Sequence, residues 1–310
     1  MQYIGEIISI GVAFSWTATA MASEVASKRL GVVVANVWRM LFAGLCSAAL
    51  CWLLLGHALP IYADTHAWGW LLLSGVVGYF FGDWCLFNSY LWIGSRYGQL
   101  FMTLAPVFSA FAAWVSLGQN LSAMDLVAMA VTIFGIAISI LNRGGKRKVS
   151  MQLPWQGVLF GIGAGVGQGV GLVLSKIGLD AYTAGVPTDI LPSIANYLPF
   201  SANLIRCIAG FLCFAAWLLV RGRGWAFCTS YRDRRGMGML GIAVVFGPFL
   251  GVGFSLLAVQ HVAAGIASTL MATTPIIILL PSWYFFHQKI TPKAVIGAVI
   301  SVIGASLFFL

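Results

Sequence analysis

The most constraining feature of this sequence is a series of long apolar runs separated by short polar connections. A helix needs about 20 mostly apolar residues to cross the hydrocarbon core of a bilayer. Only 8% of the residues are charged and 60% are hydrophobic, with a mean hydropathy of +0.95, whereas soluble domains carry about a quarter charged residues. The sequence therefore predicts an all-α membrane protein with ten transmembrane helices, at residues 3–23, 32–55, 68–92, 97–117, 124–141, 156–176, 198–220, 237–258, 263–286 and 294–310.

The basic residues are distributed unevenly between the two sets of connections. Of the 17 Lys and Arg residues, 14 lie in the odd-numbered connections and one, Lys176, in an even-numbered connection. Cytoplasmic connections are enriched in basic residues, so we expect the odd connections in the cytoplasm and both termini outside. This bias also explains the net charge of +9 without nucleic-acid binding. The predicted location is a bacterial inner membrane. The 14 residues are Lys28, Arg29, Arg96, Arg143, Lys146, Arg147, Lys148, Arg221, Arg223, Arg232, Arg234, Arg235, Lys289 and Lys293.

Two halves of the chain repeat the same pattern. Asn36, Arg39 and Cys46 recur 167 residues later as Asn203, Arg206 and Cys213. The segment Gly78–Gly82 recurs at an offset of 169, as do several single residues, and the pair Ser27-Lys28 recurs as Ser175-Lys176. The single matches at that offset are Pro106 with Pro275, Gln119 with Gln288, Ser122 with Thr291 and Gly135 with Gly304.

Each copy contains five predicted spans, and this odd number has a topological consequence. The second copy must enter the membrane upside down relative to the first, which is the inverted repeat typical of secondary transporters. We therefore divide the chain into a first repeat at 1–142, a basic connecting loop at 143–155 and a second repeat at 156–310.

The ordered residues of each half resemble the EamA domain. They are Lys at the end of the first span, Arg early in the second, and Pro followed by an amide and Ser or Thr before a Gly-bearing fifth span. Two such domains in tandem resemble the drug/metabolite transporter superfamily, whose members export amino acids and other metabolites and whose relatives carry nucleotide sugars or phosphorylated sugars.

The sequence departs from that family in two respects. Gln119 and Gln288 stand where family members often have Glu, so we expect structural caps there and no titratable role. Family members are also usually drawn with both termini in the cytoplasm, whereas the charge bias of this chain predicts the opposite.

Arg39 and Arg206 are the first candidates for a binding site. A charged residue inside a membrane helix is costly and requires a partner, a water-filled cavity or a function. Each guanidinium could bind a substrate carboxylate or phosphate with a bidentate fork. The alternative is that each binds helix-end carbonyls or an acid and fixes packing.

Asp83 is the most informative acid because its repeat counterpart is Val252. The fold itself therefore does not require a carboxylate at this position. Three interpretations remain open: pairing with Arg39, binding of a substrate ammonium, and titration in proton coupling. We predict that Asp83 contributes to substrate choice.

Polar and aromatic residues inside the spans supply the remaining candidates. Those expected to line a substrate pathway are Asn88, Trp84, Tyr79, Gln99, Thr103, Gln168 and Ser268. Glu24 precedes Lys28 by four residues, a spacing that favours an ion pair. Kinked helices are expected at the intramembrane prolines. The gating or structural candidates are Glu24, Lys28, Lys176, Pro106, Pro248 and Pro275.

The sequence contains no pattern typical of an enzyme. The four histidines are far apart, and no H-E-x-x-H, G-x-S-x-G or paired-carboxylate motif occurs. We expect no catalytic residues, no metal and no cofactor. No phosphate-binding loop for ATP is present either.

The sequence thus favours a secondary active exporter of a small amphipathic metabolite, such as an amino acid, working by alternating access. The runner-up is a multidrug or cation exporter, and a different class is a non-transporting or lipid-handling membrane protein. The expected partners are a small-molecule substrate and membrane lipid, with protons an open question. A monomer is sufficient, because all ten spans belong to one chain.

Overall fold

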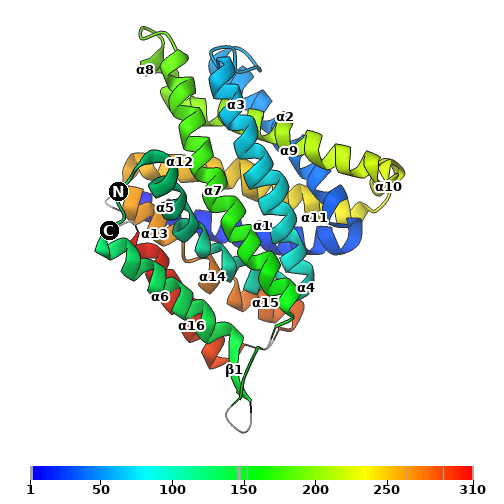
Figure 1. Ribbon diagram of the computed structural model, residues 1–310. Coiled ribbons are helices and arrows are strands. Elements are labelled where there is room, and N and C mark those ends of the chain that lie inside the picture. The colour runs from blue at the N-terminus through cyan, green and yellow to red at the C-terminus, as the bar shows by residue number, and fades with distance from the viewer. Residues whose placement is uncertain (1–2, 145–147, 152, 263, 289, 309–310) are drawn as a thin grey trace.

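A computed structural model describes residues 3–144, 148–151, 153–262, 264–288 and 290–308. Its first half is helical throughout (Figure 1). The elements are α1 (Ile4–Leu30), α2 (Val32–Leu55), α3 (Thr65–Ser74), η1 (Gly75–Gly82), α4 (Asp83–Met102), α5 (Leu104–Leu117) and α6 (Ala123–Ile140).

The second half follows a short antiparallel hairpin of β1 (Leu141–Gly144) and β2 (Lys148–Met151). Its helices up to the centre of the half are α7 (Trp155–Gly185), α8 (Leu191–Ile194), η2 (Ala195–Tyr197), α9 (Leu198–Val220) and α10 (Gly224–Ser230). The remainder are α11 (Arg234–Val244), η3 (Val245–Phe249), α12 (Leu250–His261), α13 (Ala264–Met271), α14 (Thr274–Ile277), α15 (Leu279–Phe286) and α16 (Pro292–Leu307).

The described helices agree with the predicted membrane spans. Seven are long and apolar enough to cross a bilayer, and two shorter apolar helices, Leu104–Leu117 and Pro292–Leu307, accompany them. The run predicted at 237–258 is the continuous helix α11–η3–α12. Positions 263, 309 and 310, at the ends of two predicted spans, lie outside the described residues. Over the described residues, the protein is an all-α membrane protein apart from the β1–β2 hairpin.

Single glycines turn the chain sharply between consecutive helices. Gly31, between α1 and α2, has φ 83° and ψ 149°, and Gly94 has φ 79° and ψ 159° within the continuous stretch α3–η1–α4. Side chains with a Cβ rarely adopt this backbone conformation. Gly94 therefore ends the third span and starts the fourth, which continues through residues 95–102 and, after Thr103, through α5.

Equivalent helices of the two repeats pack against each other in antiparallel fashion. A Cβ on Gly135 of α6 would lie 2.4 Å from the backbone nitrogen of Ser301 on α16, and a Cβ on Gly304 would lie 2.4 Å from that of Thr132. The repeat offset of 169 relates Gly135 to Gly304 and Thr132 to Ser301, so these two contacts are equivalent in the repeat. Close approach at small residues is the usual means of packing membrane helices. The same antiparallel pairing joins α2 and α9, where Ser47 contacts Asn203 and Cys51 contacts Ser201, as an inverted repeat requires.

Both repeats also carry a π-helical segment at the repeated glycine motif. These segments are η1 in the first repeat and η3 in the second. Pro248 lies inside η3, where it has no N–H to donate to the helix. Such π segments occur frequently at functional sites, and in the first repeat Asp83 follows immediately.

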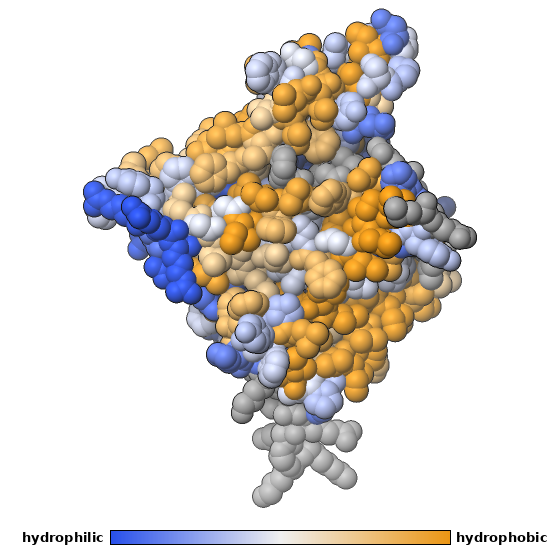
Figure 2. Space-filling view, turned by 180° about the vertical axis from the view of Figure 1, so that it is seen from behind, coloured by the Kyte–Doolittle hydropathy of each residue, from blue (hydrophilic) through white to orange (hydrophobic). Residues whose placement is uncertain are grey.

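The surface has the pattern expected of a protein embedded in a bilayer. In Figure 1 the two ends of the chain lie together, on the side away from the β1–β2 hairpin and from α10. Figure 2 shows a broad apolar belt between two hydrophilic edges. Exposed side chains that contribute apolar surface include Leu53, Trp114, Leu280 and Trp283.

One prediction about the connections, the placement of Lys176, is wrong, and the structure adds detail to the others. The basic segment predicted as a loop at 143–155 contains most of the hairpin and the first residue of α7. Lys176 lies inside α7 and not in a connection, because that helix continues to Gly185. Short helices α8 and α10 occupy two longer connections. Lys146, Arg147 and Lys289, counted among the basic connections, lie outside the described residues.

Candidate functional site

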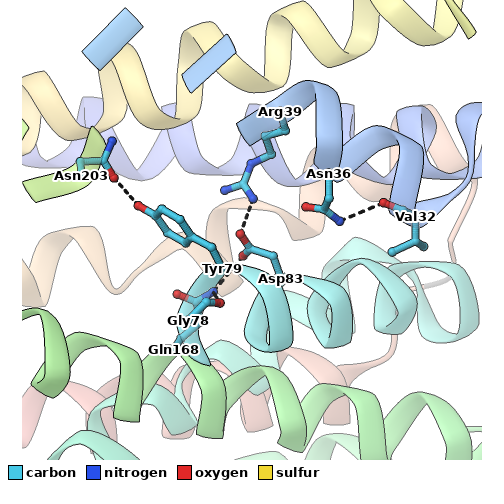
Figure 3. Close-up of polar contacts among 8 residues, drawn as sticks. All are labelled: Val32, Asn36, Arg39, Gly78, Tyr79, Asp83, Gln168 and Asn203. Atoms are coloured by element: carbon cyan, nitrogen blue, oxygen red, sulfur yellow. Dashed lines mark hydrogen bonds and ion pairs between the residues drawn. The ribbon is translucent and has the colours of Figure 1, made fainter. Parts of the chain in front are cut away.

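The polar centre of the molecule is an ion pair between Arg39 on α2 and Asp83 at the start of α4 (Figure 3). The Arg39 Nη1 lies 2.5 Å from Asp83 Oδ2, and the amide of Gln168 on α7 donates to the other carboxylate oxygen at 2.8 Å. The Asp83 side chain is only 3% exposed. Both of its oxygens are therefore occupied by protein donors.

Glycines bring these three residues together. A Cβ on Gly167 of α7 would lie 2.5 Å from the Cα of Gly82 on η1, and a Cβ on Gly171 would lie 2.7 Å from the Cα of Gly78. Backbones can approach this closely only where side chains are absent. The close approach lets the Gln168 amide also donate to the Gly78 carbonyl at 3.2 Å. The alternating glycines predicted to pack helices thus also position a polar side chain.

Arg206 on α9, the repeat counterpart of Arg39, has a different environment. Its guanidinium carbon lies 4.3 Å from the centre of the Tyr79 ring, a cation–π arrangement. The Tyr79 hydroxyl donates to the side chain of Asn203, whose amide donates to Ser47 at 2.9 Å. The Arg206 Nε is buried without a hydrogen-bond partner. Among the described residues, no acid forms an ion pair with Arg206.

A cavity of about 480 Å³ lies beside both arginines. Besides the two arginines, polar lining groups come from α1, η1, α4, α7 and α14, and the rest of the wall is largely apolar and aromatic. Both repeats contribute to it. The lining residues are Trp16, Thr19, Ala20, Ser23, Arg39, Tyr79, Leu86, Phe87, Tyr90, Gln99, Met102, Thr103, Ala105, Pro106, Gln168, Leu172, Arg206, Met271, Ala272, Thr274, Pro275 and Ala305.

The predicted pathway residues divide into two groups. Six of them line the cavity, namely Arg39, Tyr79, Gln99, Thr103, Gln168 and Arg206, as do the gating candidates Pro106 and Pro275. Four others are absent from the described lining, namely Asp83, Trp84, Asn88 and Ser268. Trp84 packs against Phe160 and Trp217, and the Asn88 amide donates to the Trp84 carbonyl at 2.7 Å.

The gating candidates occupy two different environments. Glu24 is fully buried, pairs with Lys28 as its spacing predicts, and accepts a hydrogen bond of 2.6 Å from the Ser95 backbone N–H. That N–H begins the helix after the Gly94 turn, so the carboxylate caps a helix N-terminus. The repeat counterpart of Lys28, Lys176, forms an exposed pair with Asp180 at 3.1 Å.

The prolines mark breaks in the helices. Pro106 follows the break at Thr103 before α5, and Pro275 lies in the first turn of α14 after the break at Thr273. These two positions are repeat equivalents, and both line the cavity. Pro248 lies in η3, outside the described lining.

Several lining residues were not predicted from the sequence. Thr19, Leu86, Phe87, Met102 and Met271 are of types that fill any membrane helix. No periodicity distinguishes a lipid-facing side from a cavity-facing side when both are apolar. Among the described residues, no group of three or more His, Cys, Asp or Glu side chains is arranged to hold a metal ion.

Comparison with protein families decides the class of this molecule. The model of the EamA-like transporter family matches the chain twice, at residues 3–141 and 155–310. The chain belongs to the EamA-like transporter family. This transporter is therefore a multi-pass membrane protein whose two halves each correspond to one family domain.

Comparison with solved structures supports the fold of this EamA protein. One crystal structure superposes with a TM-score of 0.59 at 13% sequence identity, covering 99% of this chain and 96% of that chain. At that identity the likeness concerns the fold alone. A search of curated proteins found no match to the transporter.

Proposed function

We propose that this EamA protein is a secondary active transporter that exports a small amphipathic metabolite, such as an amino acid, by alternating access. The observation that carries the proposal is the central cavity, which is walled by helices of both repeats and contains one arginine from each. Its volume of about 480 Å³ is within the range of small-molecule sites. Transporters built from inverted repeats bind substrate at the repeat interface.

The arrangement of the two cavity ends supports alternating access. A second cavity of about 370 Å³ shares Ala105, Pro106 and Leu172 with the first and extends to Gln119 and Asp125 beyond the end of α5. Phe308, at the end of α16, also lines this second cavity. Toward the opposite side, the buried Glu24 joins α1 to the Ser95 turn. We propose that the helices rock against each other, so that the cavity opens alternately at its α5 end and at its Glu24–Ser95 end.

The cavity favours a metabolite over a cation as the transported solute. A multidrug exporter would suit the aromatic walls, but attraction of a cation requires an available carboxylate. Asp83 is held by Arg39 and Gln168 and lies outside the described lining. We propose that Asp83 positions Arg39 and does not itself contact the substrate.

Flux measurements test the proposed function. Purified protein reconstituted into proteoliposomes should transport at least one member of a panel of labelled amino acids, organic acids and nucleotide sugars. Ala272→Trp places a large side chain in the cavity and should abolish this flux, whereas Leu280→Trp, at a 71% exposed position, should not. Folded protein without flux of any solute would contradict the proposal, and normal flux in Ala272→Trp would exclude the cavity as the path.

We further propose that the basic connections face the cytoplasm of a bacterial inner membrane and that both termini lie outside. Support comes from the 14 basic residues of the odd connections. In variants whose other cysteines are replaced, a single cysteine at Tyr3 and the exposed native Cys228 of α10 should react with an impermeant thiol reagent from opposite sides. Labelling of the Tyr3 position from the cytoplasmic side alone would reverse the assigned orientation.

A further inference from the structure

Arg206 is the cavity arginine that forms no ion pair with a described carboxylate. Resting on the proposed transport function, we infer that the substrate is a small organic monoanion with an apolar body. Its carboxylate binds Arg206, and an amino group contributes nothing to its recognition. The inference narrows the substrate class from amino acids and similar solutes to organic acids whose anionic head is their only charge.

The unsatisfied donors of Arg206 are the first observation behind this inference. A guanidinium has five N–H donors in a fixed fork. Arg206 donates to no described residue, and its buried Nε has no partner. An unpartnered buried donor is costly, more so when it is charged. A carboxylate fits the fork with two parallel hydrogen bonds, so binding of an anion removes this cost.

The second observation is that the Arg206 guanidinium rests on a fixed platform. The ring of Tyr79 lies under it at 4.3 Å, and the Tyr79 hydroxyl is held through Asn203 to Ser47. On another side, a Cβ on Gly78 would lie 3.2 Å from Arg206 Nη2, so a larger residue at that position would press on the guanidinium. A positioned fork loses little freedom when it binds a ligand.

The third observation concerns the charges around the cavity. All eight acidic residues belong to the described part of the chain, and none lines the cavity. Asp83 neutralises Arg39, and Glu24 is held by Lys28 and the Ser95 N–H. Arg206 therefore leaves the cavity with one net positive charge. A monoanion balances this charge, whereas the ammonium of an amino acid would be desolvated without a carboxylate partner.

The remaining wall suits an apolar body. Trp16, Leu86, Phe87, Met102 and Met271 line the cavity around its few neutral polar groups. Methionine and aromatic side chains adapt to irregular apolar ligands. The geometry thus combines one anionic contact with an apolar enclosure, and branched-chain or aromatic acids without an amino group have this shape and charge.

Ligand trios that share one body test the inference directly. The first is 3-phenylpropanoate, phenylalanine and 2-phenylethylamine, and the second is 4-methylpentanoate, leucine and 3-methylbutylamine. Binding to the purified full-length protein is measured by calorimetry, with the total tryptophan fluorescence, to which Trp16 of the cavity contributes, as a second signal. In each trio that binds, the monoanion should bind at least about tenfold more tightly than the amino acid, which is a difference of about 1.4 kcal/mol in binding free energy. The amine should not bind.

Variants locate the anion contact. Arg206→Gln should lower affinity for the monoanion at least about tenfold, and Arg206→Lys should restore only part of it because an ammonium lacks the fork. Arg221→Gln removes an exposed arginine outside the cavity and should bind as the wild type does. Thermal unfolding of each variant verifies its fold.

The outcomes separate this inference from the proposed function. Tighter binding of the amino acid or the amine, unchanged monoanion binding in folded Arg206→Gln, or failure of both monoanions to bind would each overturn the inference. The comparison of ligands uses wild-type protein, so it stands even where a variant does not fold. Flux of amino acids alone in proteoliposomes would overturn the inference and leave the transport function intact. Monoanion binding without any flux would overturn the transport function instead.

Discussion

The two buried arginines occupy equivalent positions of the repeat but have different partners. Arg39 pairs with Asp83 and lies 5.3 Å from the Phe87 ring, whereas Arg206 stacks on Tyr79 and forms no ion pair with a described acid. The difference arises from two positions, because the counterpart of Asp83 is Val252 and that of Tyr79 is Pro248. The apolar packing of the fold is duplicated, while its buried acids are not.

Glu24 is a second buried acid that the other repeat does not duplicate. Its repeat counterpart, at the offset of 148 that relates Lys28 to Lys176, is Leu172. Glu24 is buried against the Ser95 turn, and Leu172 lines both cavities. The first repeat therefore supplies both buried carboxylates, Asp83 and Glu24, and the second repeat supplies Arg206, the cavity arginine without an ion pair to a described acid. Symmetry of packing gives two similar halves that can move, and asymmetry of charge makes the two sides of the cavity chemically distinct.

Replacing Asp83 by the residue of the other repeat should have the largest effect. Asp83→Val leaves Arg39 buried without a counter-charge, and breaking a buried pair in this way costs about 3–5 kcal/mol. We expect a large drop in the thermal unfolding temperature of the purified protein. Arg39→Met combined with Asp83→Val removes both charges and should recover most of the stability. If Asp83→Val unfolds at the wild-type temperature, the ion pair is not a structural element.

Glu24→Leu copies the second repeat at the other buried acid and should have an intermediate effect. The change leaves the Ser95 N–H without its acceptor and Lys28 without its partner, which costs about 1–3 kcal/mol. Glu24→Gln keeps an acceptor for Ser95 and should be less destabilised. The matched control is Asp180→Asn in the exposed pair with Lys176, where about 0–1 kcal/mol is expected. Equal losses at the two sites would show that burial of Glu24 does not matter.

The repeat and the apolar helices could be predicted from the sequence because they depend on hydropathy, chain length and residue spacing. The Glu24–Lys28 pair follows from helix geometry alone, and pairing of Arg39 with Asp83 was one of three open interpretations. These features are local, or they involve charges that leave few alternatives inside a membrane.

The remaining features depend on packing between distant segments. Asn36 and Asn203 align in the repeat, but Asn36 donates to Val32 in its own helix at 3.0 Å while Asn203 bonds Tyr79 and Ser47 on other helices. Alignment cannot distinguish these two roles. The Gly94 turn, by contrast, falls in the connection between the predicted spans 68–92 and 97–117. Which apolar residues face the cavity depends on helix rotation, which tertiary contacts set.

The smallest effect is expected at a pair of acids that the repeat does conserve. Asp64 and Asp233, related by the offset of 169, cap α3 and α11 by accepting from the backbone N–H of Ala67 at 2.7 Å and of Gly236 at 3.0 Å. Only Asp233 also accepts from Arg29, at 2.8 Å and 3.0 Å, which links α11 to the end of α1. Here the asymmetry is a surface ion pair added to a shared cap.

The Asp233 pair should be visible as a pH dependence of stability. The Arg29 guanidinium, and then the Gly236 N–H, hold the pKa of Asp233 below its ordinary value of 3.8. A carboxyl group whose pKa is lowered in the folded state stabilises the fold at pH values above its ordinary pKa. This contribution is lost as the pH falls from the ordinary pKa through the lowered pKa. Asp233→Asn keeps a capping side chain and loses the ion pair. Its unfolding temperature should lie slightly below that of the wild type at neutral pH, and the difference should shrink toward about pH 3.

Asp64→Asn retains its cap without losing an ion pair, so at neutral pH it should cost less than Asp233→Asn. A difference for Asp233→Asn that grows in acid would contradict the assigned sign.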